Sequence, residues 1–160
     1  IQKEELKLKK SEVIKLKLFS CSWFKQARTV MFYVSRGCEV NTLGMIKEAK
    51  LKGKSVVVPR LIPGERIMVP CVVTNLKKDL EAGPYSIKQP KMHCPIQPSL
   101  ADIDLVIVPA VAFDRKGNRL GRGKGYYDLF LSGLPEKVHT VGLAFKFQIL
   151  KKEHGPKFHQ

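Results

Sequence analysis

Short apolar runs rich in β-branched residues recur along this chain, and segments with helical character stand beside or between them. The helical segments include residues 2–19 and 43–52, and the apolar runs cover residues 29–34, 55–58, 105–108 and 138–145. Strands that alternate with helices in this way are typical of a parallel sheet with right-handed crossovers. We therefore predict an α/β fold, with a mainly parallel sheet flanked by helices in three open layers. A chain of 160 residues is long enough for one domain with a real core, so we expect a single domain over residues 1–160.

Turn-forming residues predict where several of these elements end. Pro59 is expected to close the strand that precedes it, and Gly133 to end the helix that starts near Tyr126. Residues 61–73 alternate turn signals with short apolar runs, which indicates a strand or a hairpin. Residues 80–99 contain four prolines, so we expect a largely irregular connection there.

The net charge of +15 arises from 29 Lys and Arg residues against 14 Asp and Glu residues. Such a charge indicates polyanionic partners, but it does not choose among nucleic acids, nucleotides and multiply carboxylated small molecules. The lysines are spread along the chain without interleaved aromatic residues, which disfavours a nucleic-acid partner. We expect small-molecule substrates and a monomer.

The sequence gives little support for a membrane protein, a disulfide-stabilised protein or a zinc-binding protein. No apolar run approaches the length of a membrane span, and the Lys-rich start lacks the features of a signal peptide, so we expect a cytoplasmic protein with no membrane partner. The four cysteines form no Cys-x-x-Cys pair, which predicts neither a disulfide framework nor a zinc site. His93 and Cys94 are adjacent, but no second His/Cys pair at ligand spacing accompanies them.

A glycine-rich basic loop follows the third apolar run. It reads Gly121-Arg-Gly-Lys-Gly125, and a helix is expected to begin at Tyr126. Alternating glycines let backbone N–H groups converge, and the basic residues between them direct positive charge to the same point. A phosphate is therefore the expected ligand. A solvated basic turn is the alternative interpretation. The loop is not a Walker A motif, because Gly125 stands where Ser or Thr would follow Lys124, and its spacing differs from the dinucleotide fingerprint.

Two acidic residues stand where ligands are expected. Glu39 follows the first strand, and open α/β sheets bind ligands beyond the carboxyl ends of their strands. Asn41 or Thr42 can cap the helix that comes next. Asp128 lies in the first turn of the helix after the glycine loop. Each acid also has a simpler interpretation, as a solvated charge or as a favourable charge in a first helical turn.

The segment Asp104-Leu-Val-Ile-Val-Pro-Ala-Val-Ala-Phe-Asp114, followed by Gly117-Asn-Arg-Leu-Gly-Arg-Gly-Lys-Gly-Tyr-Tyr-Asp128, resembles the 5-formyltetrahydrofolate cyclo-ligases, also called methenyltetrahydrofolate synthetases. This match is long and specific. Weaker matches cover most of the chain in the right order, at Glu39–Thr42, Pro59–Arg60, Gly83–Pro90, Val141–Phe145 and Gln148.

The resemblance implies an enzyme that uses ATP and Mg²⁺ to close the ring of 5-formyltetrahydrofolate to 5,10-methenyltetrahydrofolate, with release of ADP and phosphate. The formyl oxygen would take the terminal phosphoryl group, N10 would attack the activated carbon, and phosphate would leave. Such chemistry needs positioning and charge neutralisation more than a dedicated base, which a basic glycine loop can supply.

The same resemblance implies roles for individual residues. The catalytic residues would be Arg122 and Lys124, and Asp128 would hold Mg²⁺. The implied ATP-binding residues are Arg119, Leu120, Gly121, Arg122, Gly123, Lys124, Gly125, Tyr126 and Tyr127. The implied folate-binding residues are Glu39, Asn41, Arg122, Gly123, Lys124, Gly125 and Tyr126. Tyrosines at a helix start are otherwise packing residues, and that alternative remains open for Tyr126 and Tyr127.

The chain looks shortened at both ends relative to this family. An initial helix with ATP-binding cations would precede Ile1, and a final segment with a metal-binding Asp would follow Lys152. A non-catalytic folate- or nucleotide-binding relative is therefore an alternative function. A basic nucleic-acid-binding protein is a third, which rests on net charge alone.

Overall fold

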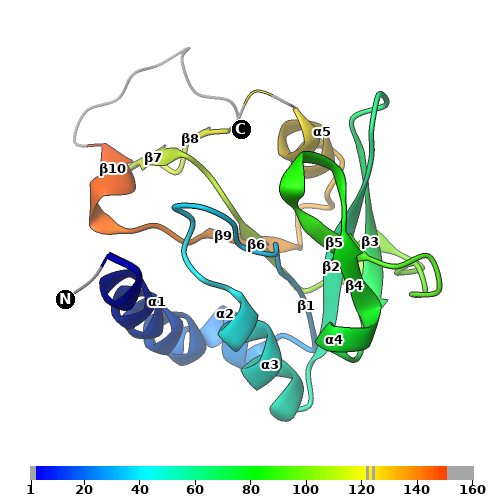
Figure 1. Ribbon diagram of the computed structural model, residues 1–160, viewed down its shortest axis with the longest axis horizontal. Coiled ribbons are helices and arrows are strands. Elements are labelled where there is room, and N and C mark those ends of the chain that lie inside the picture. The colour runs from blue at the N-terminus through cyan, green and yellow to red at the C-terminus, as the bar shows by residue number, and fades with distance from the viewer. Residues whose placement is uncertain (1–2, 122, 124, 151–160) are drawn as a thin grey trace.

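The computed structural model describes residues 3–121, 123 and 125–150, and a five-stranded sheet forms its centre (Figure 1). The strand order is β3-β2-β1-β6-β9. The strands are β1 (Thr29–Met31), β2 (Ser55–Ile62), β3 (Ile67–Val73), β6 (Leu105–Val108) and β9 (His139–Gly142). β1 pairs in parallel with β2 and β6, β6 pairs in parallel with β9, and β3 pairs antiparallel with β2. The predicted α/β class with a mainly parallel sheet is confirmed.

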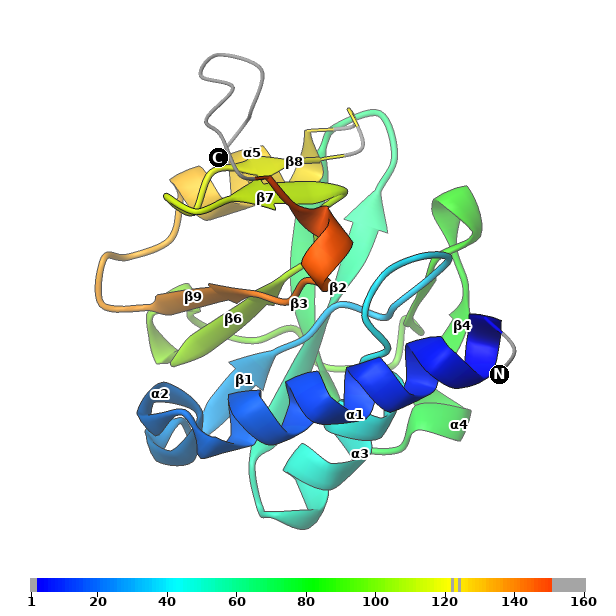
Figure 2. The ribbon, with the colours of Figure 1, turned by 90° about the vertical axis from the view of Figure 1, so that its left-hand side faces the viewer.

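Helices cover both faces of this sheet (Figure 2). On one side lie α1 (Lys3–Ser20), α2 (Ser22–Gln26) and α3 (Leu43–Leu51), and on the other side lies α5 (Tyr126–Ser132). Successive residues of a strand point to opposite faces. The buried strand residues that pack with the first three helices include Val30, Val56, Val58, Leu105 and Ile107. Those that pack with α5 include Met31, Val57, Val106 and Val108.

Two smaller sheets accompany the central sheet, and β5 of one of them packs beside β2. One has the order β10-β7-β8, and the other pairs β4 with β5. Their bounds are β4 (Leu80–Ala82), β5 (Lys88–Pro90), β7 (Ala112–Asp114), β8 (Arg119–Leu120) and β10 (Ile149–Leu150). The remaining elements are α4 (Leu76–Asp79) and the 3-10 turns η1 (Pro84–Ser86), η2 (Leu100–Asp102) and η3 (Lys146–Gln148).

The strand predicted to end before Pro59 instead continues to Ile62. Pro59 faces Pro70 in the pairing of β2 with β3, so the two missing N–H groups fall at a single position of the ladder. The other paired positions of this antiparallel hairpin hold the strands together despite the hydrogen bonds missing at this position. The hairpin predicted for residues 61–73 is thus present, but it starts earlier, inside the preceding strand.

Other boundaries differ in ways that shape the site. The first strand ends at Met31 and not at Val34, because Tyr33 turns toward the next loop, where its carbonyl accepts a 2.6 Å hydrogen bond from Oγ1 of Thr42. The connection at 80–99 is less irregular than predicted, since β4 and β5 form a short hairpin there. The strand predicted at 138–145 covers only His139–Gly142.

Candidate functional site

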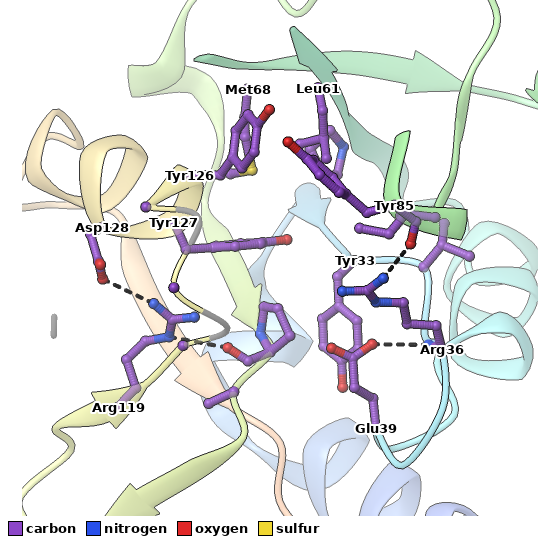
Figure 3. Close-up of a pocket in the computed structure, with 18 of the residues that line it drawn as sticks. Tyr33, Arg36, Glu39, Leu61, Met68, Tyr85, Arg119, Tyr126, Tyr127 and Asp128 are labelled. Carbon is purple, nitrogen blue, oxygen red and sulfur yellow. Dashed lines mark hydrogen bonds and ion pairs between the residues drawn. The ribbon is translucent and has the colours of Figure 1, made fainter. Parts of the chain in front are cut away.

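A cavity of about 440 Å³ opens beyond the carboxyl ends of β1, β2 and β6. Its size falls in the range of small-molecule sites, roughly 300–1,000 Å³. Arg119 and Asp128 lie on one side of it, Arg36 and Glu39 lie on the other, and tyrosines project between them (Figure 3). This is the edge of an open α/β sheet where ligands are expected.

Glu39 anchors one end of the cavity. It is buried, and its Oε1 accepts a 2.9 Å hydrogen bond from the backbone N–H of Arg36. The hydroxyl of the neighbouring Tyr33 donates to the carbonyl of Val40 at 3.2 Å. Burial, reinforced by the charge of Glu39, raises the pKa of both Tyr33 and Tyr127. Both phenols therefore stay protonated at neutral pH and can act as hydrogen-bond donors.

Arg119 organises the opposite end. Its side chain is buried, with Nε donating to the carbonyl of Pro109 at 3.1 Å and Nη1 donating to Oδ1 of Asp128 at 3.1 Å. Its guanidinium carbon also lies 5.4 Å from the ring centre of Tyr127. Burial lowers the pKa of Arg119, while the charge of Asp128 opposes that shift. Arg119 thus ties β8 and α5 to the end of β6.

The glycine loop passes directly over this arginine. A Cβ built on Gly121 would lie 3.1 Å from Nη2 of Arg119, so a side chain here would press on the buried guanidinium. Gly125 adopts a φ of 79° immediately before α5, in the left-handed region that favours glycine. The lack of side chains at these two positions keeps the floor of the cavity open.

Two tyrosines and two apolar residues form a further wall. Tyr85 meets Tyr126 edge to face, with ring centres 6.2 Å apart, and Leu61 and Met68 line the cavity beside them (Figure 3). Burial raises the pKa of Tyr126, and a hydrogen bond with Tyr85 adds to that effect. Nη1 of Arg36 donates to the carbonyl of Tyr85, which fixes the β4–β5 hairpin against the loop that carries Glu39.

The structure brings most of the predicted site residues into this one cavity. Those that line it are Glu39, Arg119, Leu120, Gly121, Gly123, Gly125, Tyr126, Tyr127 and Asp128. Arg122 and Lys124 lie outside the described residues. Asn41 is not among the residues that line the cavity. Thr42 occupies the N-cap position of α3 without a capping side-chain bond, and Oδ1 of Asn41 accepts a 3.0 Å hydrogen bond from the N–H of Leu43, the first residue of the helix.

Several residues that line the cavity were not predicted as site residues. They include Tyr33, Arg36, Arg66, Met68, Tyr85 and Lys88. Arg36 follows β1 just as Glu39 does, so the rule on strand ends could have found it. Tyr85 lies in the Gly83–Pro90 stretch that carries the resemblance. No local signal marks Arg66 or Met68, because their positions depend on how the β2–β3 hairpin folds over the sheet.

A second polar cluster lies apart from the cavity. Among the described residues, ligand atoms of Asp79, His93 and Cys94 lie within 4.8 Å of one another. Oδ1 of Asp79 is 2.8 Å from Nε2 of His93, and Oδ2 accepts hydrogen bonds from the N–H groups of Thr74 and Asn75 at 2.9 and 3.0 Å. The bond from Asn75 and that with His93 are the largest causes that lower the pKa of Asp79. This carboxylate therefore closes the turn before α4.

The four cysteines are free. Within the described ranges 3–121, 123 and 125–150, no helix combines the length and apolar character needed to cross a membrane.

Comparisons with known proteins agree with the fold and with the sequence motif. Residues 1–153 match the profile of a family described as the 5-formyltetrahydrofolate cyclo-ligase family. The 5-formyltetrahydrofolate cyclo-ligase of Mus musculus is 31% identical over 153 residues, which cover 91% of this chain and 75% of the mouse protein. That of Haemophilus influenzae is 31% identical over 125 residues, covering 78% of this chain and 67% of the relative.

A solved structure extends the similarity to three dimensions. The NMR structure of the 5,10-methenyltetrahydrofolate synthetase of Aquifex aeolicus matches with a TM-score of 0.78 at 31% identity, covering 95% of this chain and 76% of that one. A synthetase from Mycoplasma pneumoniae matches with a TM-score of 0.73 at 22% identity, which supports the fold alone.

Proposed function

The chain belongs to the 5-formyltetrahydrofolate cyclo-ligase family, and from this membership we propose that it converts 5-formyltetrahydrofolate to 5,10-methenyltetrahydrofolate with consumption of ATP and release of ADP and phosphate. One observation supports this proposal above the others. The cavity joins a buried carboxylate, Glu39, to the glycine loop in a single space, so two ligands can meet there.

The residues present fit the phosphates of ATP. Gly121, Gly123 and Gly125 all line the cavity, and their backbone can approach a ligand closely because no side chains intervene. On this proposal Arg122 and Lys124, within the same loop, supply the charges that phosphoryl transfer requires.

The site also fits Mg²⁺. Oδ1 of Asp128 accepts from Arg119, and within the described part of the chain Oδ2 has no hydrogen-bond partner, which leaves one carboxylate oxygen for a cation. Mg²⁺ commonly uses one or two carboxylates and keeps several waters. When bound, ATP supplies the phosphoryl group that activates the formyl oxygen, and Mg²⁺ neutralises the phosphate charge.

The remaining wall suits the folate ring. Glu39 can accept hydrogen bonds from ring N–H groups, because its buried carboxylate gains from any donor brought against it. The protonated hydroxyl of Tyr127 stands nearby as a donor, whereas that of Tyr33 already donates to the carbonyl of Val40. Tyr85 and Tyr126 offer flat apolar faces that exclude water from the reacting groups.

An absorbance assay tests the proposal directly. The purified chain, given 5-formyltetrahydrofolate, ATP and Mg²⁺, should form methenyltetrahydrofolate, and leaving out ATP should stop the reaction. Glu39→Gln should raise the KM for 5-formyltetrahydrofolate about tenfold, because a charge-assisted hydrogen bond contributes about 1.5–3 kcal/mol. The matched control is Glu81→Gln, because Glu81 is an exposed acid on β4. This variant should leave the KM for 5-formyltetrahydrofolate and the KM for ATP unchanged.

Other outcomes would identify the rival functions. Binding of 5-formyltetrahydrofolate without turnover would refute the enzymatic function and favour a non-catalytic binding protein. Oligonucleotide binding with a steep salt dependence, and no folate binding, would favour the nucleic-acid alternative.

A further inference from the structure

Arg66 lies on the turn between β2 and β3, 59 residues before Gly125 in sequence but next to it in space. A Cβ built on Gly125 would lie 3.4 Å from Cδ of Arg66 and 3.6 Å from its Nη1, so the arginine side chain runs alongside the loop backbone. Arg66 also lines the same cavity as Gly121 and Gly123. Its guanidinium therefore stands at the edge of the proposed phosphate site, on an element other than the glycine loop.

The other two arginines of the cavity are committed to protein groups. Arg119 is buried and donates to Pro109 and Asp128, and Arg36 donates to the carbonyl of Tyr85. Arg66 is exposed, and within the described residues its guanidinium makes no hydrogen bond or ion pair. Of these three guanidinium groups, that of Arg66 can bind a ligand without giving up a partner.

The backbone of Arg66 is unusual for its residue type. Its φ is 57°, in the left-handed region that residues other than glycine and asparagine seldom adopt. The turn itself is closed by the N–H of Glu65, which donates to the carbonyl of Ile62 at 3.4 Å. Glycine would adopt this backbone conformation with less strain than arginine does.

We propose that Arg66 binds the phosphoryl groups of the nucleotide held by the glycine loop. This inference rests on the proposed function, in which ATP is a substrate. The planar guanidinium presents a fork of donors that matches two phosphate oxygens, which an ammonium cannot do. Its contact with Gly125 places it at the end of the cavity that carries the loop, and Glu39 lies at the other end. Arg66 is therefore a binding residue for the phosphates and not for the folate ring.

Substitution of Arg66 by Gly tests this assignment with little risk to the fold, because glycine adopts the observed φ readily. Calorimetry should show that Arg66→Gly weakens ATP binding about tenfold, as expected for one lost charge-assisted contact, and that Arg66→Lys restores part of the loss. The KM for ATP should rise in parallel, while the KM for 5-formyltetrahydrofolate stays within about twofold. Glu65→Ala, in the same turn but outside the cavity lining, should leave both values unchanged.

The two proposals fail in different ways. Unchanged ATP affinity in Arg66→Gly, an absence of ATP binding in the unsubstituted protein, or a rise confined to the KM for 5-formyltetrahydrofolate would overturn the role of Arg66. ATP binding that weakens in Arg66→Gly, in a protein that shows no turnover, would support Arg66 and refute the cyclo-ligase activity. Turnover by the unsubstituted protein, together with unaltered ATP affinity in Arg66→Gly, would support the cyclo-ligase activity and refute the role of Arg66.

Discussion

Replacing Arg119 with Met should loosen the wall of the pocket where β8 and α5 meet. Methionine keeps much of the apolar volume of the arginine stem, so the loss is mainly that of the guanidinium contacts. Those contacts join elements that are distant along the chain, with Pro109 at the end of β6 and Asp128 in α5. The variant should therefore lose global stability, in addition to any loss of ligand binding.

The structure sets the size of the effect. A hydrogen bond from a charged donor contributes about 1.5–3 kcal/mol, and the carbonyl of Pro109 would lose its donor in a buried place. The bond to Asp128 contributes less, about 1 kcal/mol, because that carboxylate is 35% exposed. The contact with the ring of Tyr127 adds about 0.5–1 kcal/mol. We expect Arg119→Met to lower the free energy of unfolding by at least about 3 kcal/mol, or the Tm by at least about 6–12 °C.

Urea denaturation of four proteins measures the loss of stability and separates the contribution of the Arg119–Asp128 pair from those of the other Arg119 contacts. The proteins are the unsubstituted chain, Arg119→Met, Asp128→Asn and the double variant. The coupling free energy between the two positions should be about 1 kcal/mol, because the remaining loss belongs to Pro109 and the ring contact. Arg115→Met, at an exposed arginine in the neighbouring turn, should change stability by less than about 0.5 kcal/mol.

Two results would refute this reasoning. A loss below about 1 kcal/mol in Arg119→Met would mean that the buried guanidinium contacts contribute little. A coupling near zero would mean that the 3.1 Å contact with Asp128 has no energetic weight. In either case Arg119 would return to the role implied by the resemblance, that of a phosphate ligand only.

Three further predictions concern other parts of the chain. The hydrogen bond from the N–H of Asn75, followed by those with His93 and Thr74, lowers the folded-state pKa of Asp79 below the unfolded value of about 4. The contribution of this carboxylate to stability is therefore complete above about pH 5 and is lost progressively as the pH falls from about 4 toward the folded-state pKa. Chemical denaturation should show that Asp79→Asn flattens this dependence. Gly121→Ala should lower the Tm, measured by calorimetry, by a few degrees, because its Cβ would meet Nη2 of Arg119 at 3.1 Å, and an unchanged Tm would show that the guanidinium can move aside. Lys124→Ala should reduce kcat/KM at least about tenfold in the absorbance assay, and unchanged kinetics would mean that the phosphate is misplaced.

The sequence was sufficient for the fold class, and most of the residues that it proposed for the site line one cavity. Apolar runs with β-branched residues and the helical segments between them are local patterns, and their order alone indicates a parallel sheet. Glu39 could be named as a candidate because it follows a recognisable strand, and the glycine loop because its alternating Gly and basic residues form a local pattern. The ends of strands were harder to predict where a neighbouring strand determines them. For example, the pairing of Pro59 with Pro70 lets β2 continue past a proline.

What the tertiary structure decided is which of these residues meet and what each guanidinium contacts. The sequence motif marked Arg119 as a ligand-binding residue by resemblance and gave no signal for Arg66. Folding buries the first against Pro109 and Asp128 and lays the second beside Gly125, across 59 residues of chain. Such contacts depend on the twist of a hairpin and on the packing of α5 over the sheet. Local periodicity carries no information about either, because it records only which face of its own element a residue occupies.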